Sequence, residues 1–541
     1  MHRREVAPGR SCLECRRRKI KCDRSHPCSY CVKVHIHCQY PPPRPSHGPD
    51  VDRRGASLGL NTAAAEECPS AVGATSSRGG NGSYQAPDIE NVQVPPLQGS
   101  FQSLMAGPSH SPAANRSSSL LRPQAAIDLT AFRPSLASAM LIWQQYLDVV
   151  DPLLKIFHTP SVQQLVVRAN CSREKMDIAA ECLLFAIYYA AVAAMSPLAC
   201  KTQLEGERGI LLKRYRIGVE YLLSHLDLLN STDMTVLQAF TLYLTIGRSD
   251  QDGPDVYALV GLATGMALKM GLNQDGEALG QPPFEVEMRR RLWWQLFILD
   301  IRAAEDRQSE PCILESSFNT RLPSNIGDAD LHPQMSSPPV CGHNRTEMLY
   351  SLVRFEGSYF ARQMVFSDGF DQANAYISLS TKQKRHAIDL FQKRIEDQYL
   401  SHCDDSIPID KVTRWSIRLI LDKLRLAAID QTAEDARQGC IKLLQDAGEL
   451  RRYEGGKQWL WLFQTYIEWD ALACLLQNLR TDPVREEHDE GWHTARDVYT
   501  YWKNHESVRR DRRWDQIERL SQEVFATRNE TSVGVHWFGH K

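Results

Sequence analysis

The segment CLECRRRKIKCDRSHPCSYCVKVHIHC, residues 12–38, holds six of the 15 cysteines of this 541-residue chain. The six follow the pattern C-x2-C-x6-C-x5-C-x2-C-x6-C, so each half of the segment reads C-x2-C-x6-C. A C-x2-C pair lets two thiolates bind one metal ion, as in most structural zinc sites. The pattern therefore predicts a site for two Zn²⁺ ions whose ligands are Cys12, Cys15, Cys22, Cys28, Cys31 and Cys38.

Two of these sulfurs must bridge the ions, because six singly bound thiolates cannot complete two tetrahedral ions. The equivalence of the two halves suggests that the bridging ligands are Cys12 and Cys28. Two alternatives stay open, namely three disulfides and a mononuclear zinc site with two spare thiols. Disulfides suit short secreted peptides, but no apolar run of a signal peptide follows the basic N-terminus. A mononuclear site would use four ligands and leave two thiols unexplained.

Positive charge is concentrated around these thiols. Between Cys15 and Cys22 lies RRRKIK, whereas the matching interval of the second half reads VKVHIH. Residues 1–45 hold 11 Lys and Arg against 3 Asp and Glu, and the rest of the chain holds 52 against 62. Six thiolates and two Zn²⁺ would lower the formal charge of this head only from +8 to +6. Such a basic patch is typical of a protein that binds the phosphate backbone of nucleic acids.

A fold held by metal suits this composition. About 30 residues cannot bury enough apolar surface to fold alone, so bound metal would supply the folding free energy. Residues after Cys15 can form a short helix, fixed at both ends by ligands, that presents cations to the DNA major groove. Arg or Lys reaching guanine O6 and N7 is the commonest specific base contact, worth about 1–3 kcal/mol. The basic run could also serve as a nuclear-import signal, and both roles can coexist.

The cysteine spacing resembles the fungal binuclear zinc-cluster DNA-binding domain, Zn₂Cys₆. That family also bridges its two zinc ions through its first and fourth cysteines, and Pro27 matches its loop proline. The resemblance implies that Lys19, three residues before the third cysteine, reads a CGG triplet in double-stranded DNA. The other predicted DNA-binding residues are Arg18 beside it, Arg17 in the same run, the phosphate contacts Arg16 and Lys21, and Arg10 as an extra phosphate contact.

The residues after the cluster predict a disordered linker over 46–130. Of residues 41–130, 46 are Gly, Pro, Ser or Ala, a composition that cannot bury a core. Many members of the family place a dimerising coiled coil directly after the cluster. Residues 39–60 contain three consecutive prolines and no apolar heptad, so monomeric binding and a homodimer formed through the body both stay open.

Helical periodicity predicts that residues 131–541 form a large all-α domain. Leu136, Met140, Trp143, Leu147 and Val150 predict one apolar helix face that starts near a first-turn proline and stops at Asp151-Pro152. Further helices are predicted over these segments: 179–195, 209–229, 234–247, 256–272 and 284–300. The glycines of 256–272, Gly261, Gly265 and Gly271, predict close helix contacts. The nine scattered cysteines are expected to be buried small hydrophobes.

A second resemblance is carried by MALKMGLNQDG (266–276), FEVEMRRRLWWQLFILD (284–300) and LPSNIGDADL (322–331). Together they resemble the central homology region of many fungal zinc-cluster proteins, most convincingly over 136–335, which in that family is regulatory. Glu287 and Arg291 should pair one turn apart, and Arg289 to Arg291 should form a solvated or ion-paired face rather than a second DNA site. Leu292, Leu296 and Leu299 should form the apolar face, with Trp293 and Trp294 in the core.

The predicted architecture is a small metal-stabilised head over 1–45, with two short helices around a binuclear zinc cluster, then the linker and the helical domain. We expect a nuclear, sequence-specific regulator of RNA polymerase II transcription that controls a secondary-metabolite or catabolic gene cluster. Coactivators and any small-molecule effector stay open. No membrane partner is expected, because the apolar run 182–195 is 14 residues long and a bilayer needs about 20.

Two functions of other classes stay open as alternatives to a transcription regulator. One is a zinc-dependent protein-interaction module that reads no bases, and the other is an enzyme fused to a DNA-binding head. The sequence contains no G-x-S-x-G, Walker or H-E-x-x-H motif, so we expect that the chain is not an enzyme. Salt-dependent DNA binding by residues 1–50 would separate the regulator from both alternatives.

Overall fold

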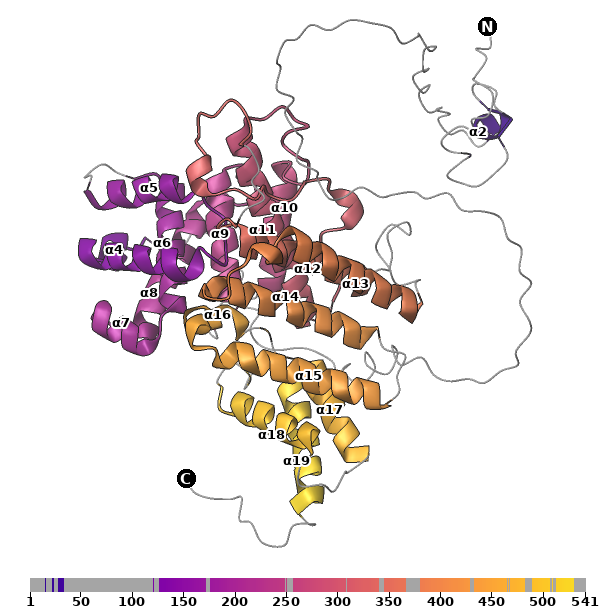
Figure 1. Cartoon of the computed structure of the whole chain (residues 1–541). Helices are drawn as coiled ribbons and strands as arrows, with labels where there is room; N and C mark the ends of the chain where they lie inside the picture. Colours follow the sequence, from indigo (N-terminus) through magenta and orange to yellow (C-terminus); the bar gives the residue numbers. More distant parts are fainter. Residues whose placement is uncertain are drawn as a thin grey trace, which may run out of the picture. The chain divides into compact units, whose positions relative to one another are not determined.

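The chain forms two separate units, one within residues 1–69 and the other within residues 70–541. We call the first the head and the second the body. The computed structural model describes residues 15, 22–23, 28–33, 120, 126–171, 176–248, 250, 256–307, 309–339, 345–365, 380–428, 433–464, 466, 468–481, 489–505, 508 and 512–529. Every described element of regular structure is a helix, which confirms the all-α prediction for the body (Figure 1).

The first half of the body contains a long series of helices. Their bounds are η3 Leu129–Phe132, α4 Leu136–Gln145, η4 Tyr146–Val150, α5 Thr159–Cys171, α6 Ile178–Ala194, α7 Pro197–Gln203, α8 Arg208–His225, α9 Met234–Gly247, α10 Val256–Lys269 and α11 Pro283–Arg307. Short polar side chains cap several of them. Ser135, Asp177, Ser196 and Asp233 accept backbone N–H groups at the starts of α4, α6, α7 and α9, which satisfies donors that the helices cannot.

The second half continues with helices as far as Asn529. Their bounds are η5 Glu315–Ser317, η6 Asp328–Asp330, α12 Leu349–Val365, α13 Thr381–Gln398, η8 Leu400–His402, α14 Pro408–Ala427, α15 Ala433–Arg452, η9 Glu454–Trp459, α16 Leu460–Phe463, α17 Trp469–Thr481, α18 Glu490–Lys503 and α19 Arg512–Asn529. Residues 458–479, QWLWLFQTYIEWDALACLLQNL, are rich in apolar side chains. The helices in this segment are the end of η9, then α16, then most of α17.

The central helix of the first half is α6, which packs against α4, α8 and α9 (Figure 1). Its residues 182–192 are buried without interruption, so it has no solvent face. Among the described helices, none is by itself long and apolar enough to cross a membrane. Only α6 and α7 taken together, which are bent by 120° at their junction, meet that criterion of length and composition.

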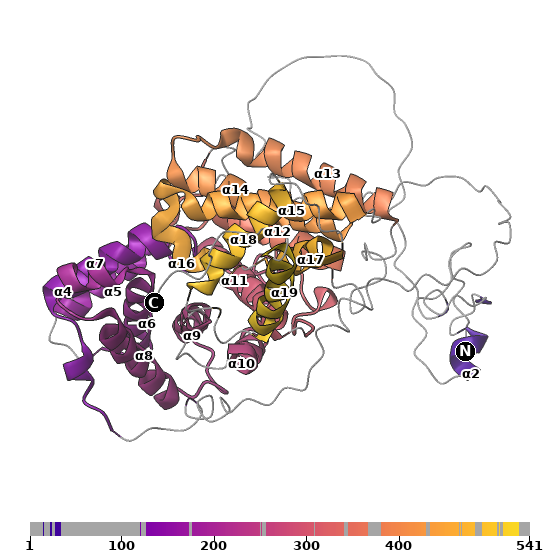
Figure 2. The same cartoon turned by 90° about the horizontal axis from the view of Figure 1, so that it is seen from below.

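A second apolar core holds the C-terminal helices together. Helix α15 packs against α14, α17 and α18, while α19 packs against α17 (Figures 1 and 2). The buried residues of this core include Trp469, Leu475 and Trp502. Leu450 of α15 belongs instead to the larger core, so α15 contributes to both.

The predicted apolar face of the first helix is wrong in part. Leu136 and Met140 are 54% and 37% exposed, whereas Ile142 and Tyr146 are fully buried. Within α4 the buried stripe instead runs through Ala139, Ile142 and Trp143, so the helix is rotated about its axis relative to the predicted face, and the π-helical turn η4 comes only after this stripe. The proline expected in the first turn lies before the cap Ser135.

The glycine prediction is also wrong for two positions. A Cβ at Gly261 or Gly265 would meet nothing within 4 Å, so no close helix contact requires them. Gly271 has a φ of +68° just after α10 and ends that helix in the left-handed region. The close approach occurs at Gly218 of α8, where a Cβ would lie 2.3 Å from the Phe185 ring of α6.

The scattered cysteines are not all buried. Cys182, Cys200 and Cys440 are buried, as expected of small hydrophobes, but Cys312 is exposed and Cys474 is partly exposed. Burial raises the pKa of the Cys200 thiol above its ordinary value, which suppresses the reactive thiolate there. The expectation therefore fails at Cys312, where the chain leaves α11 for an irregular loop.

Helix α11 is buried on all sides over residues 286–301, charged residues included. Leu292, Leu296 and Trp293 lie in the core, as predicted. Arg290 donates to both oxygens of Asp275 at 2.9 and 2.7 Å, and Arg289 donates to a backbone carbonyl after α10 at 2.6 Å. The ion-paired reading of this run is confirmed, whereas a solvated face is excluded by burial of 91% or more.

The third arginine of the run sits in a buried ionic cluster. Arg291 pairs with Glu287 at 3.0 Å, as predicted, and with Asp328 at 2.6 Å. Asp328 also pairs with Lys155 at 3.1 Å, and Lys155 pairs with Asp151 at 2.7 Å. The two motif segments 284–300 and 322–331 are thus joined through charge, which explains why both contain buried polar residues.

The body begins before residue 131, the start that was predicted from the composition of the linker. Leu120 is 2% exposed within the main apolar core, and the described chain resumes at residue 126 and enters η3 at Leu129. These positions lie inside the predicted linker 46–130, and the other residues of that linker lie outside the described residues.

Candidate metal centre and nucleic-acid interface

Four of the six predicted ligands gather in the head. Cys15, Cys28 and Cys31 are fully buried and Cys22 is 9% exposed. The ligand atoms of Cys15, Cys28 and Cys31 lie within 4.8 Å of one another, and those of Cys22, Cys28 and Asp23 form a second such group. Cys12 and Cys38 lie outside the described residues.

Cys28 belongs to both groups, and this position matches the bridging role that the repeat assigns to it. A single sulfur can bind two ions only if the other ligands of both ions surround it. The partner bridge predicted at Cys12 stays a prediction. Asp23 was not predicted from the sequence as a possible metal ligand. It is exposed and directly follows Cys22, and this position next to a predicted ligand is the feature of the sequence that could have indicated it.

Local helix geometry brings two of the ligands together. Helix α2, Ser29–Lys33, begins directly after Cys28 and contains Cys31. The backbone N–H of Cys31 donates to the Cys28 sulfur at 3.5 Å, so the C-x2-C spacing turns both thiols to one side. Tyr30 packs against the cysteines, and Lys33 is exposed at the C-terminal end of the helix.

The sulfur spacing fits zinc. The Cys15 and Cys28 sulfurs lie 3.5 Å apart. Two sulfurs at about 2.3 Å from one tetrahedral zinc would be about 3.8 Å apart, whereas disulfide sulfurs lie about 2.05 Å apart. For this pair the separation favours shared metal over a disulfide, and a set of buried thiols is the donor set that zinc prefers.

The predicted DNA-binding residues cannot be placed. Arg10, Arg16, Arg17, Arg18, Lys19 and Lys21 all lie outside the described residues. Cys15 and Cys22, which enclose RRRKIK, are described, and both are buried in the thiol cluster. If both are ligands, the metal fixes the two ends of the basic run.

Two protein families match this chain. The fungal Zn(2)-Cys(6) binuclear cluster domain matches residues 10–47, and the fungal specific transcription factor domain matches residues 143–384. The first match contains every predicted metal ligand. The second contains the helices from α5 to α12 and the buried ionic cluster of α11.

Named relatives match most of the chain. The aurofusarin cluster transcription factor aurR2 of Gibberella zeae is 29% identical over an alignment 525 residues long that covers 92% of this chain and 76% of that protein. The transcriptional regulator AacuB of Aspergillus aculeatus is 25% identical over 90% of this chain and 77% of that protein. The pyriculol/pyriculariol biosynthesis cluster transcription factor 1 of Pyricularia oryzae is 29% identical over 70% of this chain and 53% of that protein.

These matches agree with the geometry of the head and the helical architecture of the body. The cofactor of the head is a binuclear zinc cluster. The chain belongs to the fungal Zn₂Cys₆ zinc-cluster transcription factors that also carry a fungal specific transcription factor domain.

Proposed function

We propose that this transcription regulator reads CGG-containing double-stranded DNA through its head, with all six cysteines of residues 12–38 as zinc ligands. The observation that carries the proposal is the gathering of Cys15, Cys22 and Cys31 around Cys28, inside the residues that match the cluster domain. The basic run between Cys15 and Cys22 supports it, because both flanking thiols belong to that gathering.

The zinc ions supply folding free energy and fix the backbone on either side of the basic run. The chain's own residues then recognise DNA. Lys19 is proposed to donate to guanine in the major groove, with Arg18 beside it, and Arg17 adds charge to the run. Arg16 and Lys21, together with Arg10, are proposed to donate to phosphate oxygens, which position the head without reading sequence.

The proposed organisation is a DNA-binding head over 1–45, a tether over 46–130 and a regulatory body over 131–541. The family implies a nuclear protein. Two named relatives are transcription factors of biosynthetic clusters, and on that ground we propose a gene cluster of this kind as the target. The head could bind DNA as a monomer or as a homodimer. The presence and spacing of paired CGG half-sites in its genomic binding sites would distinguish the two.

The experiment is a set of binding titrations of the full chain on a CGG duplex and a scrambled duplex of equal length, at several salt concentrations. We expect tighter binding to the CGG duplex, affinity that falls steeply with salt, and loss of both after zinc chelation. Equal affinity for the two duplexes would contradict base reading. Zinc-dependent folding without salt-dependent DNA binding would favour the protein-interaction module.

A further inference from the structure

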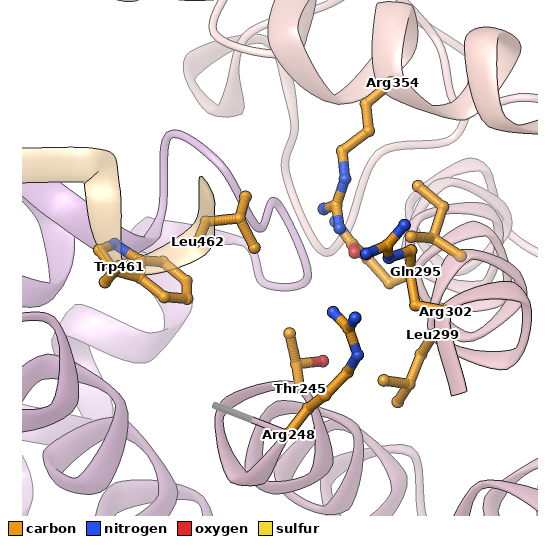
Figure 3. Close-up of a pocket in the computed structure, with 9 residues that line it drawn as sticks. Thr245, Arg248, Gln295, Leu299, Arg302, Arg354, Trp461 and Leu462 are labelled. Atoms are coloured by element: carbon orange, nitrogen blue, oxygen red, sulfur yellow. The ribbon is translucent and has the colours of Figure 1, made fainter. Parts of the chain in front are cut away.

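The body contains a small cavity that the proposed function does not use. It lies where α9, α11, α12 and α16 meet (Figure 3). Its volume is about 20 Å³, slightly more than the roughly 10–15 Å³ that one water molecule needs. Three arginines from three different elements, Arg248, Arg302 and Arg354, direct their side chains toward this one space (Figure 3).

Two of the three arginines have acidic partners. Arg248 donates to Asp306 at 3.0 Å, and Arg302 forms an ion pair with Glu305. The Arg302 guanidinium also stacks over the ring of Tyr466, with 4.0 Å between the guanidinium carbon and the ring centre. These two positive charges are therefore balanced by neighbouring carboxylates.

Arg354 differs from the other two. It is 8% exposed, and its Nη2 donates to the Tyr466 hydroxyl at 3.2 Å. Its Nε and Nη1 are buried and have no hydrogen-bond partner among the described residues. Gln295, which is 2% exposed and lines the same cavity, likewise has an Nε2 without a described partner.

Such an arrangement is costly unless something else binds there. A buried guanidinium without an anionic partner loses its hydration and gains no ion pair in return. Burial would raise the pKa of Tyr466, but the charges of the surrounding arginines outweigh it and lower that pKa. The cavity therefore has an excess of positive charge that favours an anion.

We propose that this cavity is an anion-binding site that takes a carboxylate or phosphate group of a small molecule. Arg354 and the amide of Gln295 would donate to the anion, because Arg354 Nε and Nη1 and Gln295 Nε2 are buried donors without a hydrogen-bond partner among the described residues. The Nε–H and Nη1–H groups of Arg354 point from different edges of its guanidinium, so the anion would accept a charge-assisted hydrogen bond from one of them. The cavity has room for about one oxygen atom of that group, so the rest of the group and any larger ligand would extend from it.

Trp461 and Thr245 complete the description of the site. Trp461 lines it and is 9% exposed, so a bound anion would lie near an indole whose fluorescence can report binding. The Thr245 hydroxyl donates to the Thr241 carbonyl, and its oxygen can still accept. The site lies wholly in the body, and the inference does not depend on DNA recognition by the head.

The test is calorimetric titration of the full chain with potassium phosphate and, separately, with potassium acetate, at constant ionic strength set with potassium chloride. Tryptophan fluorescence and the thermal unfolding midpoint are followed in parallel. We expect saturable binding and a midpoint that rises with anion concentration. Binding of phosphate alone assigns a phosphate ester, binding of acetate alone assigns an organic acid, and both outcomes support the site.

The decisive variant is Arg354→Met, which keeps the length of the side chain and removes its donors. We expect anion binding at least about 10-fold weaker, the loss typical of a charge-assisted hydrogen bond. Because an unpaired buried charge is removed, the midpoint without anion should equal or exceed that of the wild type. Gln295→Leu provides a second variant, with weaker binding of the same kind.

The matched control is Arg480→Met on α17, where the side chain is 48% exposed and lies outside the cavity. It should bind the anions as the wild type does. Absence of saturable binding by either anion, or equal affinity in the wild type and Arg354→Met, would overturn the proposal. DNA titrations of the same samples keep this result separate from the proposed function of the head.

Discussion

In the head, the buried side chains among the described residues are four cysteines, with Tyr30 partly buried beside them. In the body, the largest fully buried side chains include Trp293, Trp502 and Tyr146, and apolar packing fills two cores. The difference shows two ways to offset the entropy of folding. The head depends on bonds from sulfur to metal, whereas the body depends on apolar surface removed from water.

The same tripeptide, RRR, occurs in both regions with different surroundings. Arg289–Arg291 are buried in the body, where they donate to carboxylates and a backbone carbonyl. Residues 16–18 lie between two cysteines of the head and are followed by Lys19 and Lys21. Charge therefore stabilises tertiary structure in the body, whereas in the head we expect it to recognise DNA.

The largest expected effect comes from removing the shared ligand. Cys28→Ala should lose both zinc ions and unfold the head, because structural zinc contributes about 10–16 kcal/mol to folding in small zinc domains. The body should keep its helical signal and its thermal transition, since its cores contain no metal ligand from the head. Zinc content by mass spectrometry and circular dichroism of the full chain measure both.

Cys15→Ala should retain one zinc ion weakly, because its sulfur is not predicted to bridge. Cys474→Ala in the body is the control and should retain two. A chain that keeps one zinc after Cys28→Ala would show that Cys28 does not bridge. If zinc removal also abolished the thermal unfolding transition of the body, the body too would depend on metal, and the contrast with the head would be wrong.

The second effect concerns buried charge in the body. Asp328→Ala should lower the free energy of unfolding by about 3–5 kcal/mol, because it leaves Arg291 and Lys155 with fewer partners in a buried cluster. Asp330→Ala, at an exposed position two residues away, is the control: it removes the bond that its carboxylate accepts from the Gly327 N–H and should lower the free energy of unfolding by only about 1 kcal/mol or less. Denaturant unfolding measures both, and equal effects would mean that the cluster contributes nothing specific.

The third effect tests packing between two helices. Gly218→Ala should destabilise the body by about 1–3 kcal/mol, because the added carbon would lie 2.3 Å from the Phe185 ring. Gly265→Ala, at an exposed helix position with open space, should instead stabilise it by up to about 1 kcal/mol. The thermal unfolding midpoints decide the signs, and two changes of the same sign would refute this account.

The fourth effect separates the head's base contact from its phosphate contacts. Lys19→Ala should cost about 1–3 kcal/mol on a CGG duplex and relax the preference for its guanines. Arg16→Ala and Lys21→Ala should weaken CGG and scrambled duplexes about equally and reduce the salt slope by about one each. All three variants should retain zinc. Equal losses on both duplexes for Lys19→Ala would make Lys19 a phosphate contact.

The smallest effect is a pH dependence within the buried cluster. Burial raises the pKa of Asp151 to about 6, despite the opposing charge of Lys155. A raised pKa in the folded state means that folding takes up a proton, so stability rises as pH falls from 7 to 5, by about 1 kcal/mol. Burial acts to raise the pKa of Asp328, but the charges of Arg291 and Lys155 outweigh it and lower that pKa. The stabilising contribution of the Asp328 carboxylate is therefore lost only at a pH below the one that protonates Asp151.

Asp151→Asn should remove this rise, because the amide does not titrate. Denaturant unfolding of the wild type and the variant at pH 7, 6 and 5 measures the difference between them. A parallel dependence in both proteins would assign the effect to another group.

Sequence patterns located the helices of the body well where apolar runs were continuous. The segments 179–195 and 234–247 coincide closely with α6 and α9, because a fully buried helix has an uninterrupted apolar signal. The pattern failed at Leu136 and Met140, because apolar side chains lie on more than one side of α4 and only the packing against α5 and α6 selects the side that is buried. Element boundaries within 458–479 also needed the three-dimensional fold.

The sequence by itself determined the cysteine repeat, the zinc chemistry that it implies, and the separation of a basic head from a helical body. Those features depend on residue types at short spacings, which local chemistry fixes. Only the tertiary structure decided that Arg291 meets Asp328 and that Gly218 meets Phe185, and it placed Arg354 at a cavity where no described carboxylate pairs with it. These contacts join residues far apart in the chain, and no local pattern encodes which distant side chains will meet.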